Sequence, residues 1–165
     1  MPAGGSCLLG SLNLAEFVKD GAFDYADFGK AVRIAVDGLN DVLDEGLPLH
    51  PLKEQRDSVR DWRQIGLGIM GLADMLIKLG IEYGSEESID ICDSIGYVLA
   101  TTAIKESANL AHKNKILKTI PRTTINKKIR VFQKTNCTKM LKEKTAGGTK
   151  GVIINQMQKT ILRLK

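Results

Sequence analysis

The charged residues divide this chain into two unlike parts. Residues 1–112 contain 9 Lys and Arg against 18 Asp and Glu, a net charge of −9. Residues 113–165 contain 15 Lys and Arg against a single acid, Glu143, a net charge of +14. Such a change indicates either a basic tail that binds nucleic acid or membranes, or two stretches of unrelated origin. Only the first part has the hydrophobic patterning that can build a core, so it constrains the fold most.

The first half of this acidic part predicts one strand and one amphipathic helix. Residues 7–14, CLLGSLNL, form a short apolar run behind a Gly-rich turn, which indicates a buried strand. Over residues 25–44, apolar side chains recur at three- and four-residue steps and predict one face of a helix. The side chains of this face are Phe28, Val32, Ala35, Val36, Leu39, Val42 and Leu43.

The second half predicts further helices. Residues 52–62 are charged and helix-like, and residues 65–79 are apolar on nearly all sides, which predicts a buried helix ended by Gly80. Ser85 is a candidate N-cap for a last helix that reaches about residue 112. The expected fold is mostly α, with one short strand and three main helices, too little strand for a sheet. Residues 113–165 have no sustained period and predict no fold.

The glycines of residues 66–71, GLGIMG, match the GxGxxG pattern of dinucleotide-binding turns. That turn requires a hydrophobic strand before it, whereas residues 57–64 are polar and helix-like. No second strand precedes Glu86, the acid at the expected spacing. We therefore interpret these glycines as positions of close packing.

The remaining candidate residues have structural explanations. Cys92 lies among isoleucines and indicates core packing, and Cys137 lies in a Lys-rich stretch without a His or Asp companion. His50 and His112 have no metal-ligand spacing and are expected at the surface. Arg60, Trp62 and Arg63 could bind a phosphate or stack on a ring, but a charged helix face is the commoner arrangement.

Nothing in the sequence indicates a membrane protein or a secreted one. No apolar run approaches the ~18 residues that span a bilayer, and residues 1–20 lack a signal-peptide pattern. We expect a cytoplasmic protein of about one domain. Cys7 then remains as a thiol at the start of an apolar strand, where sulfur and backbone can both approach a ligand.

Three segments together resemble the large, catalytic subunit of ribonucleotide reductase. Residues 2–14, PAGGSCLLGSLNL, resemble the segment that follows the Asn-Pro-Cys-Gly-Glu radical-site motif of that family. Residues 35–44, AVDGLNDVLD, and 63–76, RQIGLGIMGLADML, resemble later family segments. The resemblance covers residues 1–114, and it implies a fragment of a ten-stranded α/β barrel, with 115–165 as a basic tail.

The resemblance implies a ribonucleoside-diphosphate reductase, which makes deoxyribonucleotides by radical and dithiol chemistry. Cys7 aligns with one of the two reducing cysteines, on a barrel strand that faces the substrate. Its redox partner and the radical cysteine would lie outside this chain, so we expect the fragment alone to be inactive. We expect it to bind no cofactor and no metal.

The resemblance also implies the partners of the complete enzyme. These are the ribonucleotide substrate, a reductant of the thioredoxin or glutaredoxin type, and a radical from a metal-containing small subunit or from adenosylcobalamin. Near residues 113–115 the family pattern stops, which leads to the hypothesis of a shifted reading frame. The alternatives are a small helical interaction module and a nucleic-acid-binding protein with a basic C-terminal arm.

Overall fold

The computed structural model describes residues 4–113. The elements in chain order are β1 (Leu8–Asn13), β2 (Val18–Lys19), β3 (Ala22–Phe23), α1 (Tyr25–Gly46), α2 (Lys53–Trp62), β4 (Ile65–Met70), α3 (Leu72–Leu79) and α4 (Glu86–Lys113), with 3-10 turns at Leu14–Phe17 and Leu47–Leu49. The predictions for the tail, Cys137 included, fall outside the described residues.

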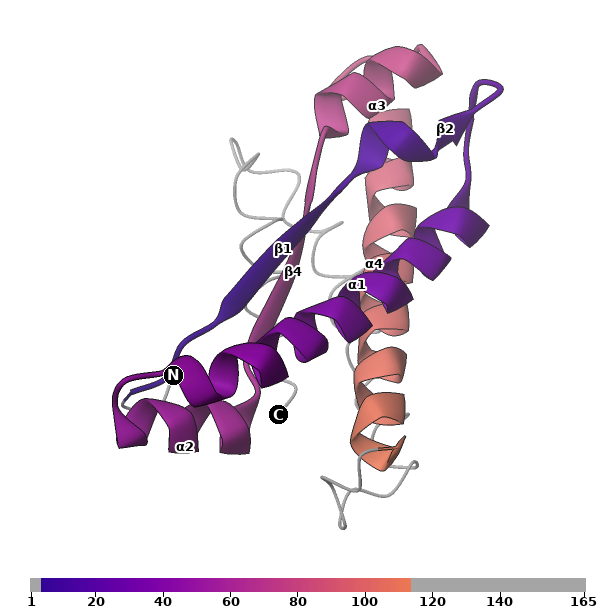
Figure 1. Ribbon diagram of the computed structural model, residues 1–165. Coiled ribbons are helices and arrows are strands. Elements are labelled where there is room, and N and C mark those ends of the chain that lie inside the picture. The colour runs from indigo at the N-terminus through magenta and orange to yellow at the C-terminus, as the bar shows by residue number, and fades with distance from the viewer. Residues whose placement is uncertain (1–3, 114–165) are drawn as a thin grey trace.

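β1 and β4 lie side by side as a two-stranded parallel sheet, which the sequence did not predict (Figure 1). Leu8 pairs with Ile65 and Asn13 with Met70. The prediction of one buried helix over residues 65–79 is therefore wrong in its first half, because residues 65–70 are strand and α3 begins only at Leu72. A run that is apolar on both sides fits a buried strand as well as a buried helix. Long-range pairing with β1 decides between the two.

The mostly helical character is confirmed, although the element count differs. The described residues contain four α-helices, two principal strands and the short β2–β3 pair, in place of one strand and three main helices. A ten-stranded barrel stays a prediction. No helix among residues 4–113 is long and apolar enough to cross a membrane.

Helix α1 packs across α4 and provides much of the core (Figure 1). Asp24 caps its start, where the carboxylate accepts a hydrogen bond of 2.9 Å from the Asp27 N–H. The predicted apolar face is confirmed in large part, since Phe28, Val32, Val36 and Leu43 are buried. Val42 was wrongly included, because it is 55% exposed.

The caps predicted around α3 and α4 are confirmed. Gly80 ends α3 in the left-handed region, at φ 70° and ψ 23°. The Ser85 hydroxyl accepts a hydrogen bond of 3.1 Å from the Ser88 N–H at the start of α4. The long helix that follows buries Ile95, Leu99 and Ala103 in the core.

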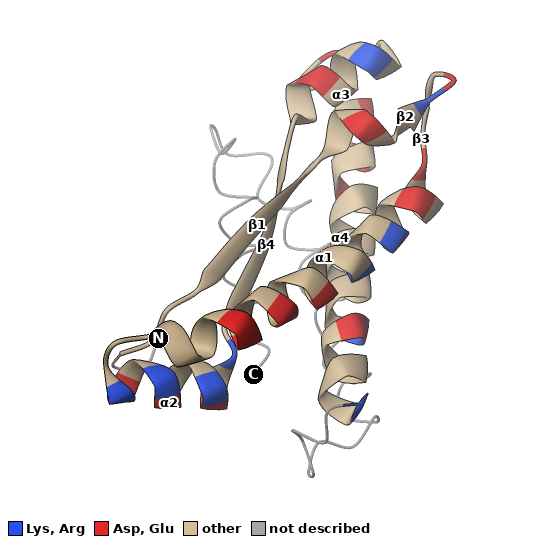
Figure 2. Cartoon of the chain, in the orientation of Figure 1, with Lys and Arg blue, Asp and Glu red and all other residues tan. Residues whose placement is uncertain are grey.

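The β1–β4 sheet carries no charged residue, whereas the helices and loops carry many. Figure 2 colours acidic and basic residues along α1 and α2, and none on β1 or β4. Uncharged, apolar strands are typical of parallel sheets that are covered on both faces. Leu9 of β1 and Met70 of β4 are nevertheless 73% and 56% exposed. These two strands thus have the composition of a more fully covered sheet.

Candidate active-site thiol

Cys7 lies directly before β1, as the sequence predicted, and its side chain is half-buried. The Leu8 N–H donates a hydrogen bond of 3.1 Å to the Gln64 carbonyl oxygen, which fixes this end of the strand beside β4. The Cys7 Sγ lies 3.8 Å from the Leu8 carbonyl oxygen, a long and weak contact for a thiol donor. The position of the Cys7 thiol is therefore set by the hydrogen-bonded backbone of the next residue.

The Gly-rich turn before Cys7 passes close to α2. Gly4 has a φ of +73°, and a Cβ at that position would lie 3.3 Å from the Glu54 carbonyl oxygen. Glycine adopts the left-handed region without steric cost and allows this approach of two backbones. The chain thus contacts α2 at Gly4 and the residue before β4 at Leu8, where β1 begins.

Arg63 ties the start of β4 to the last turns of α1. Its guanidinium donates to the two carboxylate oxygens of Asp44 at 2.6 and 2.8 Å, and to the amide oxygen of Asn40 at 3.2 and 3.4 Å. The hydrogen bonds from Arg63 hold the pKa of the Asp44 carboxyl below its ordinary value. Because Gln64 follows Arg63 directly, this contact helps to locate the backbone beside Cys7.

The arginine and tryptophan candidates form no phosphate site in the described structure. Arg60 pairs with Asp57 at 2.7 Å and with Asp61 at 3.2 Å on an exposed face of α2. Trp62 is 47% exposed, and Arg63 is engaged by α1. Arg60 thus belongs to a charged face of α2, as interpreted from the sequence. Arg63 instead pairs with a residue of α1, a contact that the residues around Arg63 in the sequence could not reveal.

The other candidate residues lie on other elements. Cys92 is half-buried on α4, His50 is half-buried in the loop before α2, and His112 is exposed near the end of α4. Within residues 4–113 no group of three His, Cys, Asp or Glu side chains could hold a metal ion. The structure therefore does not bring these residues together into a metal centre.

The GxGxxG residues do not form a phosphate-binding turn. Gly66 and Gly68 lie inside β4, and Gly71 alone stands at the junction with α3, in the left-handed region at φ 70°. A dinucleotide fingerprint places its glycines after the strand, in the turn that holds the pyrophosphate. Close packing is confirmed at Gly66, where an added Cβ would lie 2.7 Å from the Leu9 Cδ2.

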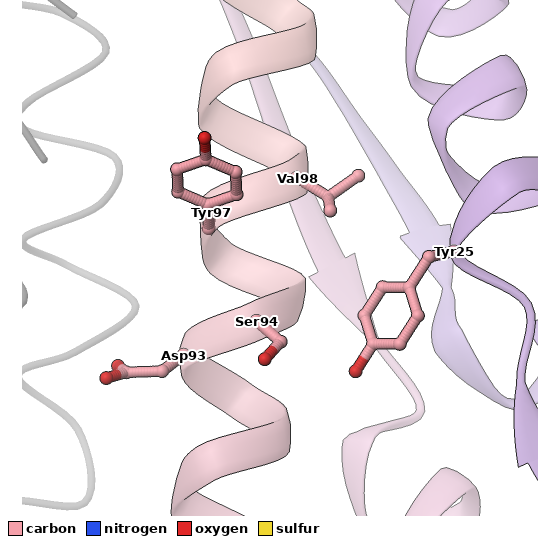
Figure 3. Close-up of a pocket in the computed structure, with 5 residues that line it drawn as sticks. All are labelled: Tyr25, Asp93, Ser94, Tyr97 and Val98. Atoms are coloured by element: carbon pink, nitrogen blue, oxygen red, sulfur yellow. The ribbon is translucent and has the colours of Figure 1, made fainter. Parts of the chain in front are cut away.

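An open depression of about 440 Å³ lies between the start of α1 and the middle of α4. Figure 3 shows Tyr25 turned toward Ser94 and Val98, while Asp93 points the other way. Tyr25 begins α1, whereas Arg63 fixes the opposite end of that helix near Cys7. The depression is therefore separate from the thiol.

Comparison with known proteins decides the family. The sequence matches the ribonucleotide reductase barrel domain over residues 2–160. The chain belongs to the ribonucleotide reductase barrel-domain family. The resemblance seen in the sequence is thereby confirmed, and the family gives no support to a separate interaction module or a nucleic-acid-binding protein. The division at residue 114 stays a prediction.

Individual reductases from distant sources resemble this barrel segment. The vitamin B12-dependent ribonucleoside-diphosphate reductase of Mycobacterium tuberculosis (strain CDC 1551 / Oshkosh) is 38% identical over 108 residues, which are 66% of this chain and 15% of that protein. The ribonucleoside-diphosphate reductase subunit alpha of Chlamydia muridarum is 36% identical over 105 residues, 64% of this chain and 10% of that protein. The ribonucleoside-diphosphate reductase large subunit of African swine fever virus (isolate Tick/Malawi/Lil 20-1/1983) is 34% identical over 107 residues, 65% of this chain and 14% of the subunit. The chain thus spans 10 to 15% of the length of these relatives.

Proposed function

We propose that this chain is a segment of the catalytic subunit of a ribonucleoside-diphosphate reductase, and that Cys7 is one of its two reducing thiols. The observation that carries the proposal is the place of Cys7, at the start of an uncharged parallel strand within the matched family segment. The relatives' names supply the reaction and the diphosphate substrate.

The chemistry proposed for Cys7 is a two-electron reduction by a pair of thiols. Cys7 and a second thiol from another strand form one S–S bond and release two protons and two electrons. At the ribose, the 2′ C–O bond breaks, the hydroxyl leaves as water, and the carbon gains a hydrogen. A reductant of the thioredoxin or glutaredoxin type then restores both thiols by disulfide exchange. The dithiol suits this step because the bond it forms is reversible.

The source of the radical lies beyond the chemistry assigned to this chain. One relative is named as vitamin B12-dependent, whereas the Chlamydia and viral proteins are named without that cofactor. We assign no step on the described residues to a metal or to cobalamin. A radical-generating small subunit and adenosylcobalamin are both compatible with the proposed role of Cys7.

The test replaces the thiol in the complete reductase that carries this segment. Conversion of a ribonucleoside diphosphate is measured for wild type and Cys7→Ser, with a thioredoxin-type reductant. We expect Cys7→Ser to lose turnover by more than about 100-fold, because a hydroxyl cannot form the disulfide. Cys92→Ser is the matched control, since that half-buried cysteine lies on α4, and it should keep turnover. Normal turnover in Cys7→Ser would refute the proposed role.

A further inference from the structure

Gly66 lies on the same face of the sheet as Cys7. In the parallel register Gly66 pairs with Leu9, and Cys7 precedes Leu9 by two residues, the spacing that returns a side chain to one face. A Cβ built on Gly10 would instead meet Leu39 of α1 at 3.5 Å. Helix α1 therefore covers the face that bears Gly10, and Cys7, Leu9 and Gly66 belong to the opposite face.

The backbone of β4 does not require glycine at position 66. Gly71 and Gly80 both have a φ of +70°, where other residues are strained, whereas the φ of Gly66 lies outside the left-handed region. Inside a strand, glycine is unfavourable, since it has more backbone freedom to lose on folding and no side chain to pack. The reason for a glycine here must therefore lie in the space that a side chain would fill.

The tip of the Leu9 side chain lies over that position, and the Cys7 sulfur lies beside it. A Cβ at position 66 would lie 2.7 Å from the Leu9 Cδ2 and 3.5 Å from the Cys7 Sγ. The first distance is too short, so the flexible tip of Leu9 would have to move. The second is a van der Waals contact, and a branched side chain would add atoms about 1.5 Å further out on this flank of the sulfur.

We propose that Gly66 is a positioning residue, which keeps the approach to the Cys7 sulfur open for a second sulfur and for the ribose. This inference rests on the proposed function, because it assigns a purpose to the space beside a reducing thiol. A disulfide brings the second sulfur to about 2 Å from the first, and the Cβ atoms of the two cysteines to about 3.8 Å. A side chain at position 66 competes with those atoms for the same flank of Cys7.

The first test measures thiol access in the full chain. Cys7 is alkylated with iodoacetamide under native conditions, and the modified peptide is quantified by mass spectrometry, with Cys92 as an internal reference. Gly66→Ala should slow the reaction of Cys7 a few-fold, and Gly66→Val by about tenfold or more. The Cys92 rate should not change. Gly10→Ala, which adds the same methyl group on the other face, should leave both rates unchanged.

Stability separates this positioning role from a structural one. Valine is favoured in strands and glycine is depleted, so Gly66→Val should unfold at an equal or higher urea concentration while its Cys7 reacts more slowly. Gly66→Ala/Leu9→Ala removes the 2.7 Å contact and keeps the methyl group 3.5 Å from the sulfur, so Cys7 should react more slowly in it than in Leu9→Ala alone, even if the valine variant does not fold. A Cys7 rate in folded Gly66→Val equal to wild type, or in Gly66→Ala/Leu9→Ala equal to Leu9→Ala, would overturn the inference.

The complete reductase separates this inference from the proposed function. With pre-reduced enzyme and a ribonucleoside diphosphate, Gly66→Val should form at least tenfold less Cys7 disulfide in one turnover than Gly10→Ala. If Cys7→Ser abolishes turnover while Gly66→Val forms the disulfide at the wild-type rate, the inference fails and the proposed function stands. If Cys7→Ser turns over normally, the proposed function fails, whatever the Gly66 variants do.

Discussion

Gly71 joins β4 to α3, and we expect Gly71→Ala to be among the most destabilising single methyl additions in this chain. Gly71 has a φ of +70° and a ψ of 25°, a left-handed conformation that costs other residues roughly 1–2 kcal/mol. A Cβ would also overlap with the Asn13 Oδ1, so the Asn13 side chain would be expelled. That oxygen accepts a hydrogen bond of 3.3 Å from the Ala15 N–H, a cap worth about 1 kcal/mol.

The expected loss for Gly71→Ala is therefore about 2–3 kcal/mol, measured by urea unfolding of the full chain with far-UV circular dichroism. Gly80→Ala is the matched control, because Gly80 has the same φ at the other end of α3 and nothing within 4 Å of its Cβ position. It should lose only the backbone part, roughly 1–2 kcal/mol.

A double-mutant cycle isolates the steric part of the loss. Asn13→Ala should cost about 1 kcal/mol alone and almost nothing more in the Gly71→Ala background, since the cap is already broken there. Equal losses for Gly71→Ala and Gly80→Ala, together with additive losses in the cycle, would refute this reasoning.

Two further predictions concern α1 and its contacts. Arg63 has a φ of 42°, and both Arg63→Gly and Arg63→Ala remove its contacts with Asp44 and Asn40, but only alanine keeps the left-handed strain. Arg63→Gly should be the more stable of the two by about 1 kcal/mol in urea, and the reverse order would contradict this account. Burial raises the pKa of Asp37, with smaller contributions from Glu106 and Asp41, and its Oδ1 is buried without a hydrogen-bond partner. A carboxyl with a raised folded pKa favours the fold below its unfolded pKa of 3.8, an advantage lost as the pH rises through the folded pKa. Asp37→Asn should therefore stabilise the chain at pH 7 and change little at pH 3, and an equal gain at both pH values would show that ionisation is not the cause.

The candidate site was predicted in part from local sequence. The Gly-rich turn and the apolar run indicated a thiol at the start of a strand, and the structure places Cys7 there. The contacts that locate this thiol escaped prediction, because each joins residues far apart in the chain. Arg63 reaches Asp44 on α1, and Gly66 comes to lie beside Leu9 and Cys7 only because β4 pairs with β1.

Local sequence sets the features that depend only on neighbouring residues. The three- and four-residue spacing of Phe28, Val32 and Val36 is set within α1, and the Ser85 and Gly80 caps act on their own helices. The family, too, could be read from segments along the chain. Tertiary structure alone decided that residues 65–70 are a strand. An apolar, Gly-containing run has no local preference strong enough to choose between helix and strand, and the hydrogen bonds that settle it come from β1, which lies far away in the sequence, before α1 and α2.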